Sequence, residues 1–279
     1  MRGPRDDRAV PAPPPRRDRP PRRDPDESLV IPEPEMWIDE GPIPASAPGS
    51  RGRGERGEGA RTTTGHSRGS AKIKVHAPLL TDLVGVKRAG RLEGRLGEAA
   101  DAFAEERFGQ ARQILAPIAR EVPDLPEARE LHGLTLYRLG KWKEAARELD
   151  AFVQLSGGST EQHPVLADCR RALQQYKEVD RLWEELREAS PSGPLMTEGR
   201  IVAAGALADQ ADLAGALRVL AKGFRFPKKP LEHHLRRAYA LADLYERSAD
   251  VPQARALFGR IAHADPEFLD AVDRAAGLG

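Results

Sequence analysis

Hydrophobic side chains recur along the carboxy-terminal part of the chain with the period of an α-helix. Trp142 is followed by Ala145, Leu149 and Phe152, whose spacing of i, i+4 and i+7 places them on one helical face. The same arrangement occurs 34 residues earlier and 34 residues later, as Phe108, Ala111, Leu115 and Ile118, and as Tyr176, Val179, Trp183 and Leu186. Three segments in one register predict a repeated helical unit.

Two further segments extend the repeat at slightly longer spacings. Leu213, Ala216, Leu220 and Gly223 are displaced by 37 residues from the third segment, and Val251, Ala254, Phe258 and Ile261 by a further 38. The breaks between periodic segments are short, so each unit is expected to be a hairpin of two helices. The pattern therefore predicts an all-α protein of about five stacked helical hairpins.

Local signals mark where several of these helices begin and end. Pro123, Pro191 and Pro266 close three of the predicted second helices, because proline disfavours helical geometry in the residue before it. Asp250 followed by Pro252 favours a helix start, with an acidic N-cap and proline in the first turn. A capping helix is expected from the last apolar run, which is Phe268, Leu269, Val272 and Ala275.

The predicted first helices also share a pattern. They contain Gly133 with Leu136, Leu166 with Ala167, Ala203 and Ala204 with Leu207, and Leu241 and Ala242 with Tyr245. With the small, aromatic and proline positions of the second helices, this pattern resembles the tetratricopeptide repeat over about residues 92–266, with departures at Arg95, Arg129 and Gly223. The resemblance implies a right-handed α-solenoid. With its Arg-rich amino terminus and the segment 163–169, the chain also resembles a group of actinobacterial tetratricopeptide proteins.

The resemblance also implies a place for a partner. In tetratricopeptide arrays the first helices line a concave groove that takes an extended peptide or a helix. The groove residues implied here are Glu127, Glu130, Leu134, Tyr137, Arg138, Asp168, Arg171, Ile201, Ala208, Arg236, Tyr239, Asp243, Glu246 and Arg247. The alternative is that these side chains only solvate an inner face. A clamp for chaperone carboxy-termini uses paired asparagines, and this chain has no Asn.

Residues 1–75 differ in composition from the repeat domain at 92–279, with residues 76–91 as a transition or amino-terminal cap. Pro, Arg and Gly dominate this arm and apolar residues are sparse, so it is predicted to be disordered. Its formal charge is 8 − 3 = +5 over residues 1–23, −7 over 24–49 and 7 − 2 = +5 over 50–75. Met36, Trp37 and Ile38 in the acidic block are interpreted as a linear motif for a partner, or as a cluster that docks on the chain's own helices.

Motifs for chemistry are weak in this sequence. Residues 52–57 match the dinucleotide fingerprint G-x-G-x-x-G, but they lie in Arg-Gly low complexity without the strand and helix that the motif requires. His233 and His234 are adjacent and expected at the surface, and Cys169 is expected to be a packed thiol. We therefore expect no catalytic residue, cofactor, metal or small-molecule substrate.

The Arg-Gly stretch offers the strongest alternative to protein binding. Arg51, Arg53, Arg56 and Arg61 are candidate contacts to RNA or to the ribosome, because arginines separated by glycine can follow phosphates without sequence preference. The stretch lacks the interleaved aromatic residues on which bases stack.

The overall composition of the chain disfavours two classes of protein, namely nucleic-acid-binding proteins with a uniformly basic surface and membrane-spanning proteins. The 279 residues include 44 Lys+Arg and 43 Asp+Glu, and this near-balance disfavours a uniformly basic nucleic-acid-binding surface. No apolar run long enough to span a membrane occurs, and a cytoplasmic location is expected. The leading hypothesis is a non-catalytic adaptor that binds a protein or peptide. The alternatives are an RNA- or ribosome-associated accessory factor, and a regulatory subunit whose groove is occupied by its own Trp37 segment.

Overall fold

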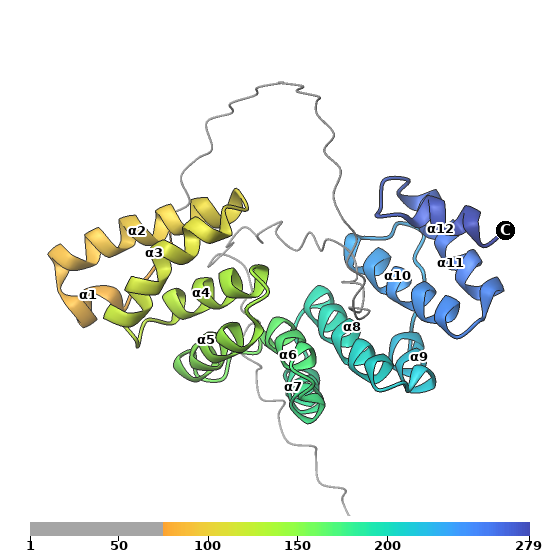
Figure 1. Cartoon of the computed structure of the whole chain (residues 1–279), viewed down its shortest axis with the longest axis horizontal. Helices are drawn as coiled ribbons and strands as arrows, with labels where there is room; N and C mark the ends of the chain where they lie inside the picture. Colours follow the sequence, from red (N-terminus) through yellow and green to blue (C-terminus); the bar gives the residue numbers. More distant parts are fainter. Residues whose placement is uncertain (1–74) are drawn as a thin grey trace, which may run out of the picture. The chain divides into compact units, whose positions relative to one another are not determined.

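The computed structural model describes residues 75–279, which form helices and no strand (Figure 1). In chain order the helices are α1 (Leu80–Val84), α2 (Val86–Ala104), α3 (Phe108–Glu121), α4 (Pro126–Arg138), α5 (Trp142–Leu155), α6 (His163–Ala172), α7 (Tyr176–Ala189), α8 (Gly193–Asp209), α9 (Leu213–Ala221), α10 (Glu232–Arg247), α11 (Val251–Ala264) and α12 (Ala271–Gly277). Within this part of the chain, no helix has the length and hydropathy needed to cross a bilayer.

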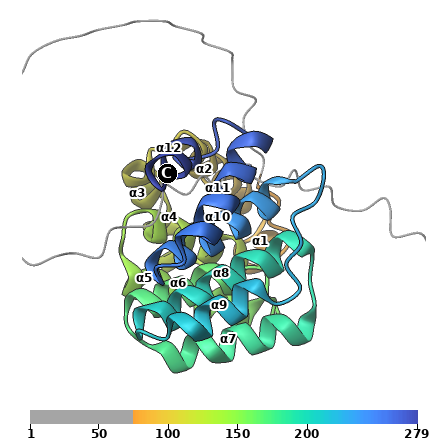
Figure 2. The same ribbon diagram turned by 90° about the vertical axis from the view of Figure 1, so that its right-hand side faces the viewer.

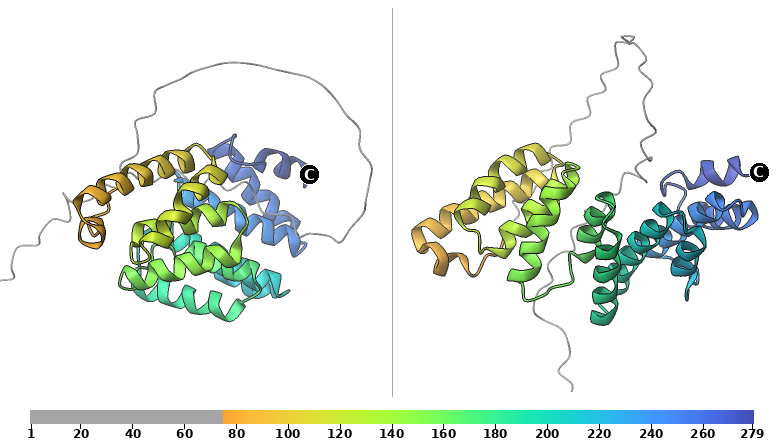
Figure 3. Two further views of the ribbon diagram at one scale, coloured as in Figure 1. Left: turned by 60° about the vertical axis from the view of Figure 1, so that its left-hand side comes forward. Right: turned by 60° about the horizontal axis from the view of Figure 1, so that its bottom comes forward.

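Ten of these helices pack as five consecutive pairs. The pairs are α2 with α3, α4 with α5, α6 with α7, α8 with α9, and α10 with α11, and Figures 2 and 3 show them from further sides. Each second helix also contacts the first helix of the next pair, as α3 does with α4. The first helices contact one another in order, from α2 through α4, α6 and α8 to α10. The predicted all-α array of five hairpins is therefore confirmed.

The second helices begin at the residues that the repeat predicted. Their first residues are Phe108, Trp142, Tyr176, Leu213 and Val251. The helices α3, α7 and α11 end two residues before the closing prolines. The helix α12 overlaps the predicted capping run, beginning after Phe268 and Leu269 and ending beyond Ala275, and α2 continues without a break across residue 91.

The turn inside each pair has the same backbone conformation. One residue at an equivalent place has a positive φ of 58–68°, and these residues are Glu106, Gly140, Gln174, Ala211 and Ala249. The N–H of the next residue donates to the carbonyl five positions before it, as Lys141 does to Leu136 at 2.9 Å. This is the Schellman helix ending, in which a left-handed residue lets the chain reverse and satisfies the last carbonyls. Only the second pair uses glycine at this place.

Small residues allow the two helices of a pair to approach closely. The predicted small positions Ala111, Ala145, Ala216 and Ala254 are fully buried. On the facing side of the second pair, a Cβ added to Gly133 would lie 2.7 Å from Leu149 Cγ, closer than carbon atoms can pack. The glycine in α4 is therefore required by the position of α5, and larger side chains at this contact would separate the helices.

Two predicted core positions differ in the structure. Trp183 is only half-buried, with the guanidinium of Arg200 5.5 Å from its ring centre, and the neighbouring Leu182 fills the core instead. Gly223 lies beyond the end of α9 with a φ of +69°, and a Cβ added to it would meet no atom beyond its chain neighbours within 4 Å. The helical period thus identified both helices correctly. It did not give the rotation of α7, which decides the burial of Trp183, or the end of α9, which precedes Gly223.

Overpacking the helix contact at Ala145 should destabilise the fold. Ala145→Leu is expected to lower the free energy of unfolding by about 1–3 kcal/mol, because the buried site has no room for three more carbons. Urea unfolding followed by circular dichroism measures the change. The matched control is Ala214→Leu at an exposed position of α9, which should alter stability by less than about 0.5 kcal/mol. Equal stability of Ala145→Leu and the parent would contradict the helix contact.

Candidate partner-binding face

The predicted groove residues of α4 and α6 are joined to α8 by one chain of polar contacts. Tyr137 Oη donates to Asp168 Oδ2 at 2.8 Å, which links α4 to α6. Arg171 donates through Nε to Asp168 at 2.8 Å and through Nη1 to Asp209 of α8 at 2.9 Å. Burial alone would lower the pKa of Arg171, but the two carboxylates outweigh burial and hold the pKa above its ordinary value. We call Tyr137, Asp168, Arg171 and Asp209 the polar ladder.

A second polar link joins α8 to α10. The guanidinium of Arg236 donates from Nε and Nη2 to the two carboxylate oxygens of Glu198, at 2.7 and 2.8 Å. Both side chains are about four-fifths buried, at 18% and 23% exposed. Such a two-pronged pair fixes orientation as well as distance. The predicted groove residue Arg236 is thus held against α8 by Glu198, which was not among the predicted groove residues.

The residues of α10 lie under the last helix of the described chain. Tyr239 is 8% exposed, and its Oη donates to Asp270 at the start of α12. Burial and Asp270 raise the pKa of Tyr239 to about 12. Arg274 of α12 donates to Asp243 at 3.0 Å and to Glu246 at 2.7 Å. The expectation that these side chains line an open groove therefore differs from the structure, in which α12 covers this end.

Glu130 of α4 faces the start of α6. Gln162 Nε2 donates to Glu130 Oε1 at 2.8 Å. Burial, with the nearby carboxylates of Glu161 and Glu127, raises the pKa of Glu130 to about 7 despite this hydrogen bond. This predicted groove residue therefore changes charge near neutral pH.

The remaining predicted residues provide the apolar part and the edges of the face. Leu134 and Ile201 are half-buried and pack against separate core clusters, while keeping part of their surface open. Arg138 lies 4.5 Å from the ring centre of Phe108, and Arg247 is exposed beside Asp243 at 3.8 Å. We define the first-helix face as the polar ladder together with Glu130, Leu134, Arg138 and Ile201.

A separate buried charge ties α4 to α5 away from this face. Glu148 is 2% exposed and accepts hydrogen bonds from Arg129 at 2.5 Å and Arg147 at 2.8 Å. His132 Nδ1 lies 3.6 Å from the same carboxylate. Burial alone would raise the pKa of Glu148, but His132, Arg147 and Arg129 outweigh it and lower the pKa to about 2. The carboxylate stays ionised, so its removal would leave buried positive charge without a partner.

The structure also describes Cys169 and the adjacent pair His233 and His234. Cys169 is fully buried, and burial raises the pKa of its thiol to about 12, as suits a packed side chain. The rings of His233 and His234 lie 3.9 Å apart, and both are half-buried. Across residues 75–279 no three His, Cys, Asp or Glu side chains are placed to hold a metal. The remaining candidates, Met36, Trp37, Ile38, Arg51, Arg53, Arg56 and Arg61, lie outside the described residues.

The sequence pattern did not point to the partners Glu198, Asp209 and Arg274. Glu198 precedes Ile201 by three residues and shares its helical face, so the helical period could have pointed to it. Asp209 and Arg274 meet residues 38 and 31 positions away, on helices whose relative rotation the sequence does not reveal.

Removing the buried carboxylate should cost stability. Glu148→Gln is expected to lower the free energy of unfolding by about 2–3 kcal/mol near neutral pH, because Arg129 loses its charged partner. The pKa is lowered in the folded state, so this stability is present above the ordinary value of 4.5 and is lost as the pH falls toward about 2. Denaturant titrations test this, with the half-exposed Glu144→Gln of the same helix as the control. A similar loss in both variants would rule out a special role for Glu148.

Glu130→Gln should remove a pH dependence of stability. The pKa of Glu130 is raised from 4.5 to about 7 by folding, so the parent loses stability as the pH rises through this interval. The variant is neutral throughout, and its Tm should exceed that of the parent at about pH 8 and approach it at about pH 5. Thermal unfolding at the two pH values measures this, with Glu144→Gln as the control. The same Tm difference at both pH values would contradict the expectation.

Comparison with known proteins gives the fold a name. No protein-family model and no curated protein matches the chain. Among solved structures, TTC0263, described as a thermophilic TPR protein in Thermus thermophilus, aligns with a TM-score of 0.52 and 19% identity, over 67% of this chain and 98% of that one. PilF of Pseudomonas aeruginosa aligns with a TM-score of 0.50 and 14% identity, over 69% and 90%. The described chain therefore has the fold of the tetratricopeptide-repeat (TPR) proteins.

Proposed function

We propose that the protein is a non-catalytic adaptor that binds a peptide or a helix of a partner protein on the first-helix face. TPR folds typically mediate protein–protein interactions, and this supports the class of function. The observation that carries the proposal is the polar ladder. Tyr137, Asp168, Arg171 and Asp209 hold three first helices together, so the face is pre-organised before a partner arrives.

The same contacts suggest how binding would work. Since the charges of the ladder are already paired with one another, little net charge is left to attract a ligand. Affinity would come mainly from apolar contact with Leu134 and Ile201 and from hydrogen bonds to the remaining acceptors. We place the site over α4, α6 and α8, because α12 already contacts the corresponding residues of α10.

The proposal is tested by capture of partners with the tagged full chain from native lysate, with half of each sample treated with nuclease. Captured proteins should persist after nuclease and decrease about fivefold or more with the double variant Leu134→Ser, Ile201→Ser, because the apolar surface is lost. The matched control is Leu155→Ser with Val272→Ser, two exposed apolar residues outside this face.

Two results would argue against an adaptor with this site. Equal loss in the two double variants would show that the first-helix face has no special part in capture. Capture of ribosomal or other RNA-bound proteins that disappear with nuclease would instead favour an RNA-associated factor acting through the Arg-Gly stretch. Circular dichroism of each variant checks that the fold is kept.

A further inference from the structure

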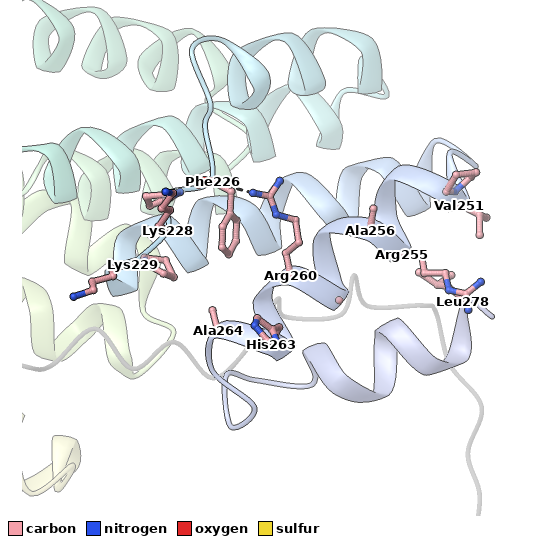
Figure 4. Close-up of a pocket in the computed structure, with 14 residues that line it drawn as sticks. Phe226, Lys228, Lys229, Val251, Arg255, Ala256, Arg260, His263, Ala264 and Leu278 are labelled. Atoms are coloured by element: carbon pink, nitrogen blue, oxygen red, sulfur yellow. Dashed lines mark hydrogen bonds between the residues drawn. The ribbon is translucent and has the colours of Figure 1, made fainter.

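A trough of about 1120 Å³ runs along the outer side of α11 (Figure 4). One wall is the non-helical segment 226–230, and the floor is the exposed surface of α11. In Figure 4 Phe226 and Arg260 lie side by side in the middle, with His263 near one end of α11 and Val251, Arg255 and Leu278 near the other. The trough belongs to a second helix and is separate from the first-helix face.

The wall of the trough exists because the fourth pair departs from the repeat period. The fifth unit is displaced by 38 residues from the fourth, against 34 between the first three, and α9 ends after nine residues. Arg200 donates to the carbonyl of Val219 at 3.0 Å, and Arg237 to that of Leu220 at 2.7 Å. These arginines satisfy the free carbonyls at the end of α9, which fixes where the connection to α10 begins.

Two phenylalanine rings, each stacked with an arginine, hold the connection between α9 and α10 against α10 and α11. The guanidinium of Arg237 lies 5.3 Å from the ring centre of Phe224, and that of Arg260 lies 4.6 Å from the ring centre of Phe226. Arg260 Nη2 also donates to the carbonyl of Phe226 at 3.4 Å. The wall is therefore anchored to both α10 and α11, and the trough is a built feature of the fold.

The charged side chains that line the trough are all basic. Lys228, Lys229, Arg255 and Arg260 line it with His263, all five are exposed, and its lining contains no acidic residue. Within residues 75–279 no Asp or Glu forms an ion pair with any of them. Residues 213–231 contain five basic side chains and no acidic one. In the first-helix face, by contrast, Arg171 is paired with two carboxylates.

Apolar groups lie between these cations. Phe226, Pro227 and Pro230 come from the wall, and Val251, which is 39% exposed, and Leu278 lie at the end of the trough near the start of α11. Partly exposed prolines and aliphatic groups beside unpaired cations suit a ligand that has carboxylates and bulky apolar side chains together. Single-stranded nucleic acid binds on open aromatic faces, and Arg260 stacks on the ring of Phe226. The lining therefore favours a peptide over RNA.

We propose that this trough binds an acidic peptide segment of a partner protein, with a bulky apolar residue of the peptide between the wall 226–230 and α11. The carboxylates of the peptide pair with Lys228, Lys229, Arg255 and Arg260, which have no acidic partner within the described chain. This would give the protein a second binding surface, independent of the first-helix face. Binding in the trough would weaken as the salt concentration rises, whereas the mainly apolar binding on the first-helix face would not.

The probe is a fluorescein-labelled peptide of about 15 residues that is rich in Glu and contains one Trp and one Leu. Its anisotropy is measured with the full chain. The double variant Lys228→Glu, Lys229→Glu should weaken binding about tenfold or more, since attraction becomes repulsion. The matched control is Lys143→Glu with Lys177→Glu, exposed lysines of α5 and α7 with the same change in charge, and should change binding less than about twofold.

Peptide variants and competitors separate the possible ligands. Replacing Trp and Leu by Ser, or Glu by Gln, should each weaken binding about tenfold, and the variant Leu134→Ser, Ile201→Ser should bind the probe like the parent. The proposal is overturned if the parent does not bind, if both lysine pairs have equal effects, or if the Ser-substituted peptide binds as well. Tighter binding of an oligouridine than of the peptide would assign the trough to nucleic acid and also overturn it.

Discussion

Four of the five helical pairs depend on a close approach of two helices at a fully buried alanine, and the third has Val179 at that position. In the second pair Gly133 faces Leu149 and Ala145 is fully buried, so α4 and α5 meet where no larger residue fits. The row of first helices follows from this approach, because each second helix can then also contact the next first helix. The ladder from Tyr137 to Asp209 forms where α4, α6 and α8 follow one another in that row.

Polar side chains serve the array in two different ways. Along the first helices, acidic and basic groups satisfy one another across neighbouring pairs, as Glu198 and Arg236 do, and this favours one relative placement of the helices. Around α11 the cations have no acidic partner within the described residues and face an open trough. The balance of charge in the whole sequence conceals this separation of paired and unpaired groups.

The pattern of the sequence predicted the second helices better than the site. Aromatic, small and proline positions act within one helix, so the beginnings at Phe108, Trp142 and Tyr176 followed from local spacing. The partners Asp209 and Arg274 come from distant helices, whose rotation depends on packing that no local pattern contains. The trough could not be predicted for a related reason. The periodic pattern of the fourth unit was extended to Gly223, whereas α9 ends at Ala221 and the connection that forms the wall begins there. The position of α12 over Tyr239 likewise could not be predicted, because it depends on a tertiary contact between Tyr239 and Asp270.

The repeated turns bear on how the chain folds. Four of the five carry an ordinary residue in the left-handed region, such as Gln174 or Ala211, at a cost of about 1 kcal/mol or more each. Gly140 in the second pair avoids this cost. In a repeat array each hairpin is stabilised largely by stacking on its neighbours. The pair α4–α5 is therefore the one whose turn needs the least support from adjacent pairs, while the four costlier turns depend on neighbouring hairpins to offset their strain.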